Sequence, residues 1–228
     1  MTRLFVTSTG TEIGKTHVTA ALAWRAHRLG RSVRVVKPLV SGFDLAAPAG
    51  SDPAVLAAAC GLALETAVLD RISPWRYRAP LSPDMAASRE GKAIDVAAVT
   101  EFCRAALAGP EDCVLVEGVG GVMVPLDGRL TVRDWIAALG IPAVLVAGSY
   151  LGTLSHTLTA RLALADAGIP LRAVVVSESP TAPVPLAETV DALQRFIPDA
   201  PILGLPRRPG AESWREAPEL SALVAVPE

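Results

Sequence analysis

The sequence predicts an α/β fold with a doubly wound, mostly parallel sheet and helices on both faces. Short runs such as 113–116 and 143–147 are apolar at every position, which is typical of parallel strands buried on both faces. Longer segments with a helical pattern, several rich in Ala, separate these runs. Strands and helices therefore alternate along the chain, which is the order that produces a parallel sheet.

Each element has a local signal. The expected strands cover about residues 4–6, 33–36, 113–117, 143–147, 172–176 and 202–204. The expected helices begin near residues 15, 52, 95, 131, 151 and 186. Gly30 and Gly168 each end a helix. A loop is expected at 44–51, an irregular surface excursion (a lid or part of a substrate rim) at 72–83, and one short helix after Arg207.

Length and composition predict a single domain over residues 1–228 and exclude several classes of function. The chain is 51% hydrophobic and 4% aromatic, which suits a core of Ala, Val and Leu. A formal net charge of -2 without basic runs argues against nucleic-acid binding. The chain begins with a strand rather than a leader, and no apolar run approaches the roughly 20 residues of a membrane span, so we expect a cytoplasmic protein without a membrane partner. Cys60, Cys103 and Cys113 show no metal-binding spacing and are expected to be buried free thiols.

Residues 8–16, Ser-Thr-Gly-Thr-Glu-Ile-Gly-Lys-Thr, predict a P-loop and a P-loop NTPase-like fold. They lie between a strand and a helix, where glycines let backbone N–H groups surround a phosphate at the helix N-terminus. Lys15 is expected to reach the outer phosphates, and the Thr16 hydroxyl to bind Mg²⁺. Because Thr9 stands where the Walker pattern has its first glycine, an ordinary strand-to-helix turn remains an alternative on this motif alone.

Further polar residues are expected at the carboxyl ends of strands, where α/β folds bind ligands. Lys37 and Ser41 follow the strand at 33–36. Glu117 ends a buried strand, like the acid of a Walker B element, and glycines follow it at 118, 120 and 121. Asp52 is either a helix cap or a carboxylate directed at a metal. Two lysines, two carboxylates and a glycine cradle predict a site for phosphoryl transfer.

In order and spacing these motifs resemble the dethiobiotin synthetase family over nearly the whole chain. The matching segments are 5–7 with 11–16, 37–38 with 41–42, 51–52, 80–83 with 90–91, 116–118 with 120–121, and 151–153 with His156. The resemblance implies a biotin-pathway ligase that uses ATP and Mg²⁺ to carboxylate 7,8-diaminononanoate with CO₂. A carbamate and a carbamic-phosphoric anhydride precede closure to the cyclic urea. The family is homodimeric, with the substrate site at the interface.

The resemblance also implies roles for individual residues. The residues implied to bind Mg²⁺ are Thr16, Asp52 and Glu117. The residues implied to be catalytic are Lys15, Lys37 and Thr11. Nucleotide binding falls to Glu12, Ile13, Gly14, Lys15, Thr16, Glu117, Gly118, Gly120, Gly121 and Ser177. Substrate binding falls to Lys37, Ser41, Gly152, Thr153 and Ser155, the last three reaching the partner subunit's substrate. His156 is expected to be a packed or surface residue rather than a catalytic one.

The chain departs from the family pattern at four positions. Ser8 replaces the usual first glycine of the loop, and Val119 replaces a small alanine beside the substrate. Ser155 replaces an asparagine near the substrate carboxylate, and Ser177 replaces the asparagine that commonly contacts adenine. These changes put the loop shape, the substrate contact and the base preference in question, but leave the lysines and carboxylates intact.

Three rival functions remain open at this stage. Partitioning-type P-loop ATPases carry a signature lysine where this chain has Gly10. Cobalamin-pathway amide ligases normally add an amidotransferase domain, for which 228 residues leave no room. A nucleotide-binding regulator is compatible with the serines at 8, 155 and 177, and ATP turnover that depends on the diamine would separate it from the enzyme.

Overall fold

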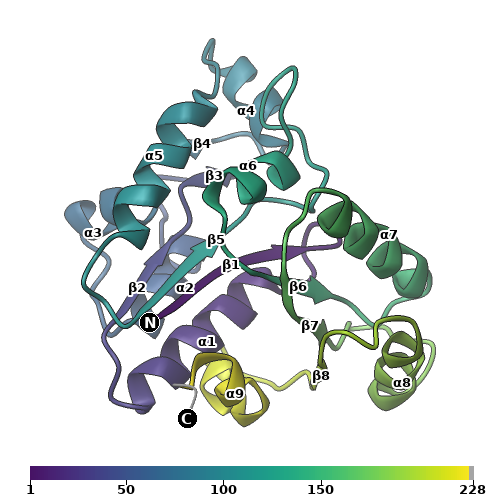
Figure 1. Cartoon of the computed structure of the whole chain (residues 1–228). Coiled ribbons are helices and arrows are strands. Elements are labelled where there is room, and N and C mark those ends of the chain that lie inside the picture. Colours follow the sequence, from purple (N-terminus) through teal and green to yellow (C-terminus); the bar gives the residue numbers. More distant parts are fainter. Residues whose placement is uncertain (226–228) are drawn as a thin grey trace.

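The centre of the molecule is a six-stranded, fully parallel sheet, seen here in a computed structural model that describes residues 1–225 (Figure 1). Across the sheet the strands are β2 (Val33–Val36), β5 (Cys113–Glu117), β1 (Thr2–Ser8), β6 (Ala143–Ala147), β7 (Leu171–Ser177) and β8 (Ile202–Leu205). The predicted α/β class with a doubly wound parallel sheet is confirmed. The last three residues of the predicted 1–228 domain lie outside the described part.

Helices cover both faces of this sheet, because successive strand residues point in opposite directions. Phe5 and Val116 belong to one core, whereas Val6 and Leu115 belong to the other. The first core lies under α5 (Val96–Leu107), α6 (Val132–Leu139), α7 (Thr153–Asp166) and α8 (Leu186–Phe196). The second lies under α1 (Lys15–Arg28) and α2 (Asp52–Ala59) (Figure 1). The loops after β1 and β5 therefore emerge side by side at one edge, since these strands are direct neighbours.

The prediction of irregular structure throughout 72–83 was wrong in part, because the segment contains a short strand, whereas residues 73–74 and 78–82 are irregular. Residues 75–77 form β4 (Trp75–Tyr77), which pairs in parallel with β3 (Leu39–Ser41) in a small second sheet. On either side lie α3 (Thr66–Ile72) and α4 (Pro83–Arg89). Three residues are too few to show a period, and their partner strand lies far away in the sequence. The connection between β4 and α4 reaches the phosphate loop's side of the molecule.

The chain after β8 packs against α1 rather than forming a free tail. It contains two 3₁₀ turns, Ser213–Glu216 and Pro218–Leu220, before the expected short helix α9 (Ser221–Val224) (Figure 1). Trp214 is buried, with its ring centroid 5.8 Å from that of Trp24 in an edge-on arrangement. The Arg25 Nε donates to the carbonyl oxygen of Ala217 at 3.1 Å. These contacts attach the segment to the C-terminal half of α1.

The cysteines are free thiols, but one departs from the expected burial. Cys103 and Cys113 are buried, whereas Cys60, at the end of α2, is only partly buried. Burial raises the pKa of Cys60 to about 12 and that of Cys113 to about 11. Both thiols are therefore protonated at neutral pH and poor nucleophiles. Separately, no helix within residues 1–225 is both long and apolar enough to cross a bilayer.

Candidate active site

The P-loop connects the end of β1 to the first turn of α1. Gly14 has a φ of 100°, and a Cβ there would lie only 2.7 Å from the Ser177 Oγ. Only glycine combines this left-handed backbone with so close a neighbour. Among residues 1–225, the backbone N–H groups of residues 10–14 donate to no protein acceptor. They are thus available to an anion at the N-terminus of α1.

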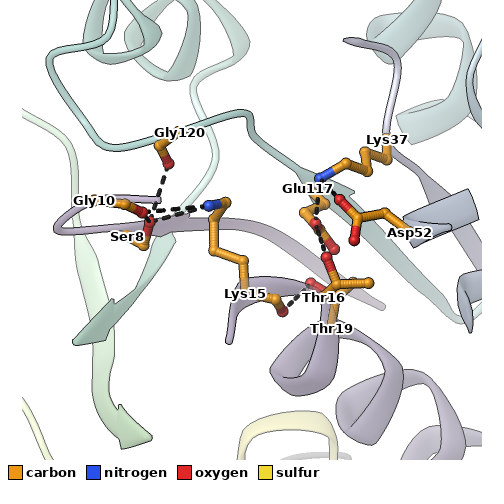
Figure 2. A network of polar contacts seen from close by, with 9 residues as sticks. All are labelled: Ser8, Gly10, Lys15, Thr16, Thr19, Lys37, Asp52, Glu117 and Gly120. Atoms are coloured by element: carbon orange, nitrogen blue, oxygen red, sulfur yellow. Dashed lines mark hydrogen bonds and ion pairs between the residues drawn. The ribbon is translucent and has the colours of Figure 1, made fainter. Parts of the chain in front are cut away.

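Lys15 lies in a buried position at the base of this loop. Its side chain points back toward β1, with Nζ 3.2 Å from the Ser8 Oγ and 3.5 Å from the Gly10 carbonyl oxygen (Figure 2). Burial, and secondarily the positive charge of Lys37, lowers the pKa of Lys15 to about 8. No carboxylate in the described chain forms an ion pair with its ammonium group. The positive charge of the Lys15 ammonium is therefore available to an incoming phosphate.

Lys37, Asp52, Glu117 and Thr16 form one connected network (Figure 2). The Lys37 Nζ lies 2.6 Å from Glu117 Oε1 and 2.9 Å from Asp52 Oδ2. The Thr16 hydroxyl donates to the same Glu117 Oε1 at 2.7 Å. Burial would lower the pKa of Lys37, but the two carboxylates outweigh burial and raise it above its usual value. Burial would raise the pKa of Asp52, but the charge and hydrogen bond of Lys37 outweigh it and lower that pKa.

The local structure also decides between the two interpretations of Asp52. Ser51 occupies the N-cap position of α2, and Asp52 is the first helical residue. Neither side chain accepts a hydrogen bond from the first turn. The Asp52 carboxylate instead contacts Lys37, and 46% of its side-chain surface stays exposed. It thus faces the ligand edge of the sheet rather than capping the helix.

The donor set fits a magnesium ion that is shared with phosphates. Glu117 is fully buried, and its Oε2 has no hydrogen-bond partner within residues 1–225. A buried carboxylate oxygen without a partner is costly unless a ligand satisfies it. No cluster of three or more His, Cys, Asp or Glu side chains occurs in the described chain. Two carboxylates and one hydroxyl are nevertheless the sparse protein ligation that Mg²⁺ uses when phosphates and water complete its shell.

A cavity of about 660 Å³ opens above these groups. It brings together many of the predicted site residues, namely Thr11, Glu12, Gly14, Lys15, Thr16, Lys37, Ser41, Asp52 and Gly120. Val119 lies in its wall, as expected for a residue beside the substrate. The buried oxygens Ser41 Oγ and Ser82 Oγ have no hydrogen-bond partner in the described part of the chain. Both serines also line this cavity.

A second cavity, of about 580 Å³, continues along the other side of the P-loop. Its walls include Ser177 and Glu178 from the end of β7, and Arg207 from the loop after β8. Both cavities are lined by Glu12, Gly14 and His17, so together they extend across the phosphate loop. Burial, and secondarily Arg207, lowers the pKa of His17. The volume of this second cavity and its position beside the P-loop suit the base and ribose of a nucleotide.

The glycines after Glu117 serve packing as much as access. The Gly118 N–H already donates to the Val6 carbonyl, and a Cβ on Gly118 would meet the Phe5 ring at 2.8 Å. A Cβ on Gly121 would lie 3.2 Å from backbone atoms of the P-loop. Gly120 alone of these three lines the larger cavity. The close approach of the two loops thus depends on Gly118 and Gly121, whereas Gly120 is the one of the three that borders the cavity.

Three predicted substrate residues lie away from both cavities. Gly152 precedes α7, and Ser155 is exposed on its first turn. The Thr153 hydroxyl is buried and donates to the Gly148 carbonyl at 2.7 Å. Gly152 and Ser155 lie on an outer surface, and the role of the three residues toward another subunit stays a prediction. His156 is exposed, as expected, with Nδ1 2.9 Å from the Tyr150 hydroxyl.

Sequence reasoning missed three residues of this site. His17 and Arg207 were not singled out, although His17 follows the P-loop directly and Arg207 follows β8 as Lys37 follows β2. Ser82 lies within the Pro-rich segment 80–83, which matched the family pattern, but its hydroxyl was not considered. The general rule that strand ends carry ligand contacts could have identified Arg207.

Comparison with known proteins places the chain in a family. The model of a family described as an AAA domain matches residues 2–212. An ATP-dependent dethiobiotin synthetase of Acidiphilium cryptum (strain JF-5) is 48% identical over 204 residues, covering 88% of this chain and 91% of the relative. One from Caulobacter vibrioides (strain NA1000 / CB15N) is 46% identical over 226 residues, covering 99% and 100%. The chain belongs to the ATP-dependent dethiobiotin synthetase family.

Solved structures share its fold at low sequence identity. A chain of the MinC:MinD cell division protein complex of Aquifex aeolicus matches with a TM-score of 0.59 and 13% identity, covering 100% of this chain and 98% of that chain. A ParA family ATPase of Chlorobium tepidum TLS matches with a TM-score of 0.55 and 17% identity, covering 98% of both. At such identities the likeness concerns the fold alone, and the predicted P-loop NTPase-like fold is confirmed.

Proposed function

We propose that this chain is a dethiobiotin synthase, which carboxylates 7,8-diaminononanoate with CO₂ at the expense of ATP and closes the product to a cyclic urea. The single observation that carries the proposal is a 660 Å³ cavity lined by Lys15, Lys37 and Asp52, with the buried Glu117 paired to Lys37, in a chain of the dethiobiotin synthetase family. Its cofactor is Mg²⁺, and ATP is a substrate.

The nucleotide occupies both cavities in this account. The free N–H groups of residues 10–14 and the Lys15 ammonium hold the outer phosphates. Thr16, Asp52 and Glu117 hold the magnesium ion, which offsets the negative charge of the β- and γ-phosphates when bound. The base and ribose lie in the second cavity, between Ser177 and Arg207.

The chemistry proceeds in three steps. One amine of the substrate adds to CO₂ and loses a proton, which gives a carbamate. A carbamate oxygen attacks the γ-phosphorus, the bond to the bridging oxygen breaks, and ADP leaves. The second amine attacks the carbamoyl carbon of the anhydride, the carbon–oxygen bond breaks, and phosphate leaves with that oxygen and one proton is lost. Both nitrogens are then bonded to the same carbonyl carbon, which gives the cyclic urea.

Lys37 and Lys15 lower the barrier of the second step. A carbamate and a triphosphate are both anionic, so electrostatic repulsion opposes their alignment. Lys37 remains protonated at neutral pH because its two carboxylate neighbours raise its pKa. A fixed ammonium at the junction of both ligands stabilises the charge on the transferring group. The Thr11 and Ser41 side chains, which border the cavity, are placed to orient the diamine and its carbamate.

A homodimer completes the site in this proposal. Leu151 is 86% exposed, and Leu154 and Leu162 on α7 are 41% and 63% exposed. Exposed apolar side chains grouped on a helix and in the turn before it are typical of an interface. Pairing through α7 would carry Gly152, Thr153 and Ser155 toward the partner's cavity.

The same site is compatible with one rival function. A nucleotide-binding regulator would use the same P-loop and both cavities without turning over the diamine. Phosphate release from Mg·ATP, measured with and without 7,8-diaminononanoate in the presence of bicarbonate, separates the two. The enzyme gives diamine-dependent phosphate release with one cyclic urea per phosphate. Phosphate release that does not depend on the diamine, or nucleotide binding without phosphate release, would support the regulator.

A further inference from the structure

Ser8 is the last residue of β1, and it connects three parts of the site. Its fully buried side chain places Oγ 3.2 Å from the Lys15 Nζ. The same oxygen lies 2.5 Å from the Gly10 carbonyl and 3.0 Å from the Gly120 carbonyl (Figure 2). The family pattern implies glycine here, which could make none of these contacts. The backbone at Ser8 is an ordinary extended strand, so the serine fits without strain.

The chemistry of the groups fixes how this hydroxyl is used. An ammonium group can only donate, so the Ser8 oxygen accepts from Lys15. The single hydroxyl proton then goes to the carbonyl of Gly10 or of Gly120. The other neighbour of the Lys15 ammonium is the Gly10 carbonyl at 3.5 Å, which is long for a hydrogen bond. The Ser8 hydroxyl is therefore the best acceptor for Lys15 among the described residues.

We propose that Ser8 is a positioning residue that holds the Lys15 ammonium at the base of the phosphate cavity. One N–H of the ammonium is directed to Ser8, which leaves the others for the outer phosphates of a nucleotide. A lysine side chain that is already ordered loses less conformational freedom when its ligand binds. The inference rests on the proposed nucleotide-binding role of this cavity and adds a residue to it.

A purely structural role for Ser8 makes a different prediction. In that case its hydroxyl would only tie the P-loop to the Gly120 loop, and its loss would weaken nucleotide binding whatever residue stands at position 15. If Ser8 acts through Lys15, its loss has no effect once the ammonium is gone. A double-mutant cycle of Ser8→Ala and Lys15→Met measures this difference directly.

The experiment is ADP binding by calorimetry, which needs neither diamine nor CO₂. We expect Ser8→Ala to weaken ADP binding about five- to tenfold, as for loss of a hydrogen bond to a charged group. In the Lys15→Met background the same change should have no further effect. Thr7→Val is the matched control, because the neighbouring Thr7 Oγ1 is buried without a hydrogen-bond partner within residues 1–225. It should leave ADP binding unchanged.

AMP provides a second measurement if Lys15→Met binds ADP too weakly to compare. AMP lacks the outer phosphates, so Ser8→Ala should leave its affinity unchanged and reduce the ratio of ADP to AMP affinity. Equal losses in both backgrounds, equal losses for ADP and AMP, or no loss at all would overturn the proposal. Because only nucleotide binding is measured, a failure to make the cyclic urea would refute the proposed function and leave this result standing.

Discussion

The Lys37 Nζ lies 2.6 Å from Glu117 Oε1 and bridges that carboxylate to Asp52, the second acid proposed to hold the metal. One ammonium group thus contacts both carboxylates and offsets part of their negative charge, while Lys37 also lines the cavity. A divalent cation held by the same carboxylates would share their charge with Lys37. Its ammonium would then be less tightly paired and better able to stabilise phosphate and carbamate oxygens.

Replacing Lys37 tests its proposed part in phosphoryl transfer. We expect Lys37→Ala to lower kcat by roughly a hundredfold or more, as for loss of a preorganised charge stabiliser. The measurement is diamine-dependent phosphate release at saturating substrates. Lys92→Ala is the control, since Lys92 forms an exposed pair with Glu90 and should retain full activity. Near-normal turnover of Lys37→Ala would remove Lys37 from the mechanism.

The carboxylates can be tested through their affinity for the metal. Glu117→Gln and Asp52→Asn should each raise the Mg²⁺ concentration needed for half-maximal ATP binding, by about tenfold or more. We expect the larger effect for Glu117, which is fully buried and also accepts from Thr16. Asp70→Asn removes a carboxylate from an exposed pair with Arg76 and serves as control. An unchanged Mg²⁺ requirement in both variants would place the metal elsewhere.

The lowered pKa of Lys15 predicts a pH dependence of nucleotide binding. A triphosphate binds the charged ammonium, which is the main form below pH 8 and is lost as the pH rises through about 8. The affinity for Mg·ATP should therefore fall between pH 7.5 and 9.5, approaching tenfold per pH unit at the upper end. Lys37 keeps its charge over this range because its pKa is raised. Lys15→Met should bind weakly and without this pH dependence; an equal slope in that variant would assign the titration to another group.

Ser177 offers a test of base preference. It lines the second cavity, and its Oγ lies directly against Gly14 of the P-loop. A longer amide at this position could both donate to and accept from a purine edge. We expect Ser177→Asn to increase the preference for ATP over other nucleoside triphosphates, measured as relative kcat/KM. Unchanged ratios would show that the base is recognised by other groups of this cavity.

The proposed dimer depends on the apolar face that begins at Leu151. Leu151→Asp places a charge in that face and should convert the dimer to a monomer with a raised KM for the diamine. Light scattering after gel filtration gives the mass in solution. Phe196→Asp is the matched control, because Phe196 is also exposed, at 65%, but lies on α8. A dimer that survives Leu151→Asp, or one lost with Phe196→Asp, would contradict pairing through α7.

The sequence predicted those elements and site residues correctly that depend on a local residue pattern. The runs 113–117 and 143–147 are apolar throughout and proved to be central strands, covered on both faces. The P-loop and the acid at the end of β5 follow from position in a parallel sheet, because strand ends meet at one edge. That rule predicts from the sequence that Lys15, Lys37 and Glu117 lie close together.

Other features depend on contacts that the sequence does not display. β3 and β4 are three residues each, and neither has a partner nearby in the chain. The segment after Arg207 is rich in Pro and charged residues, yet Trp214 anchors it on α1 through packing with Trp24. The Ser8 hydroxyl contacts Gly120, which lies more than one hundred positions away in the sequence. The replacement of the family's glycine by Ser8 could therefore suggest an altered loop shape but not this contact.

The transfer of oxygen from carbon dioxide to phosphate tests the central claim most directly. A single turnover with ¹³C,¹⁸O-labelled CO₂, Mg·ATP and 7,8-diaminononanoate can be quenched before the label exchanges with water. Mass spectrometry should then find ¹³C in the carbonyl of the cyclic urea and one ¹⁸O in the released phosphate, both absent without the diamine. Unlabelled phosphate released at the same rate without the diamine, and no cyclic urea, would contradict the account.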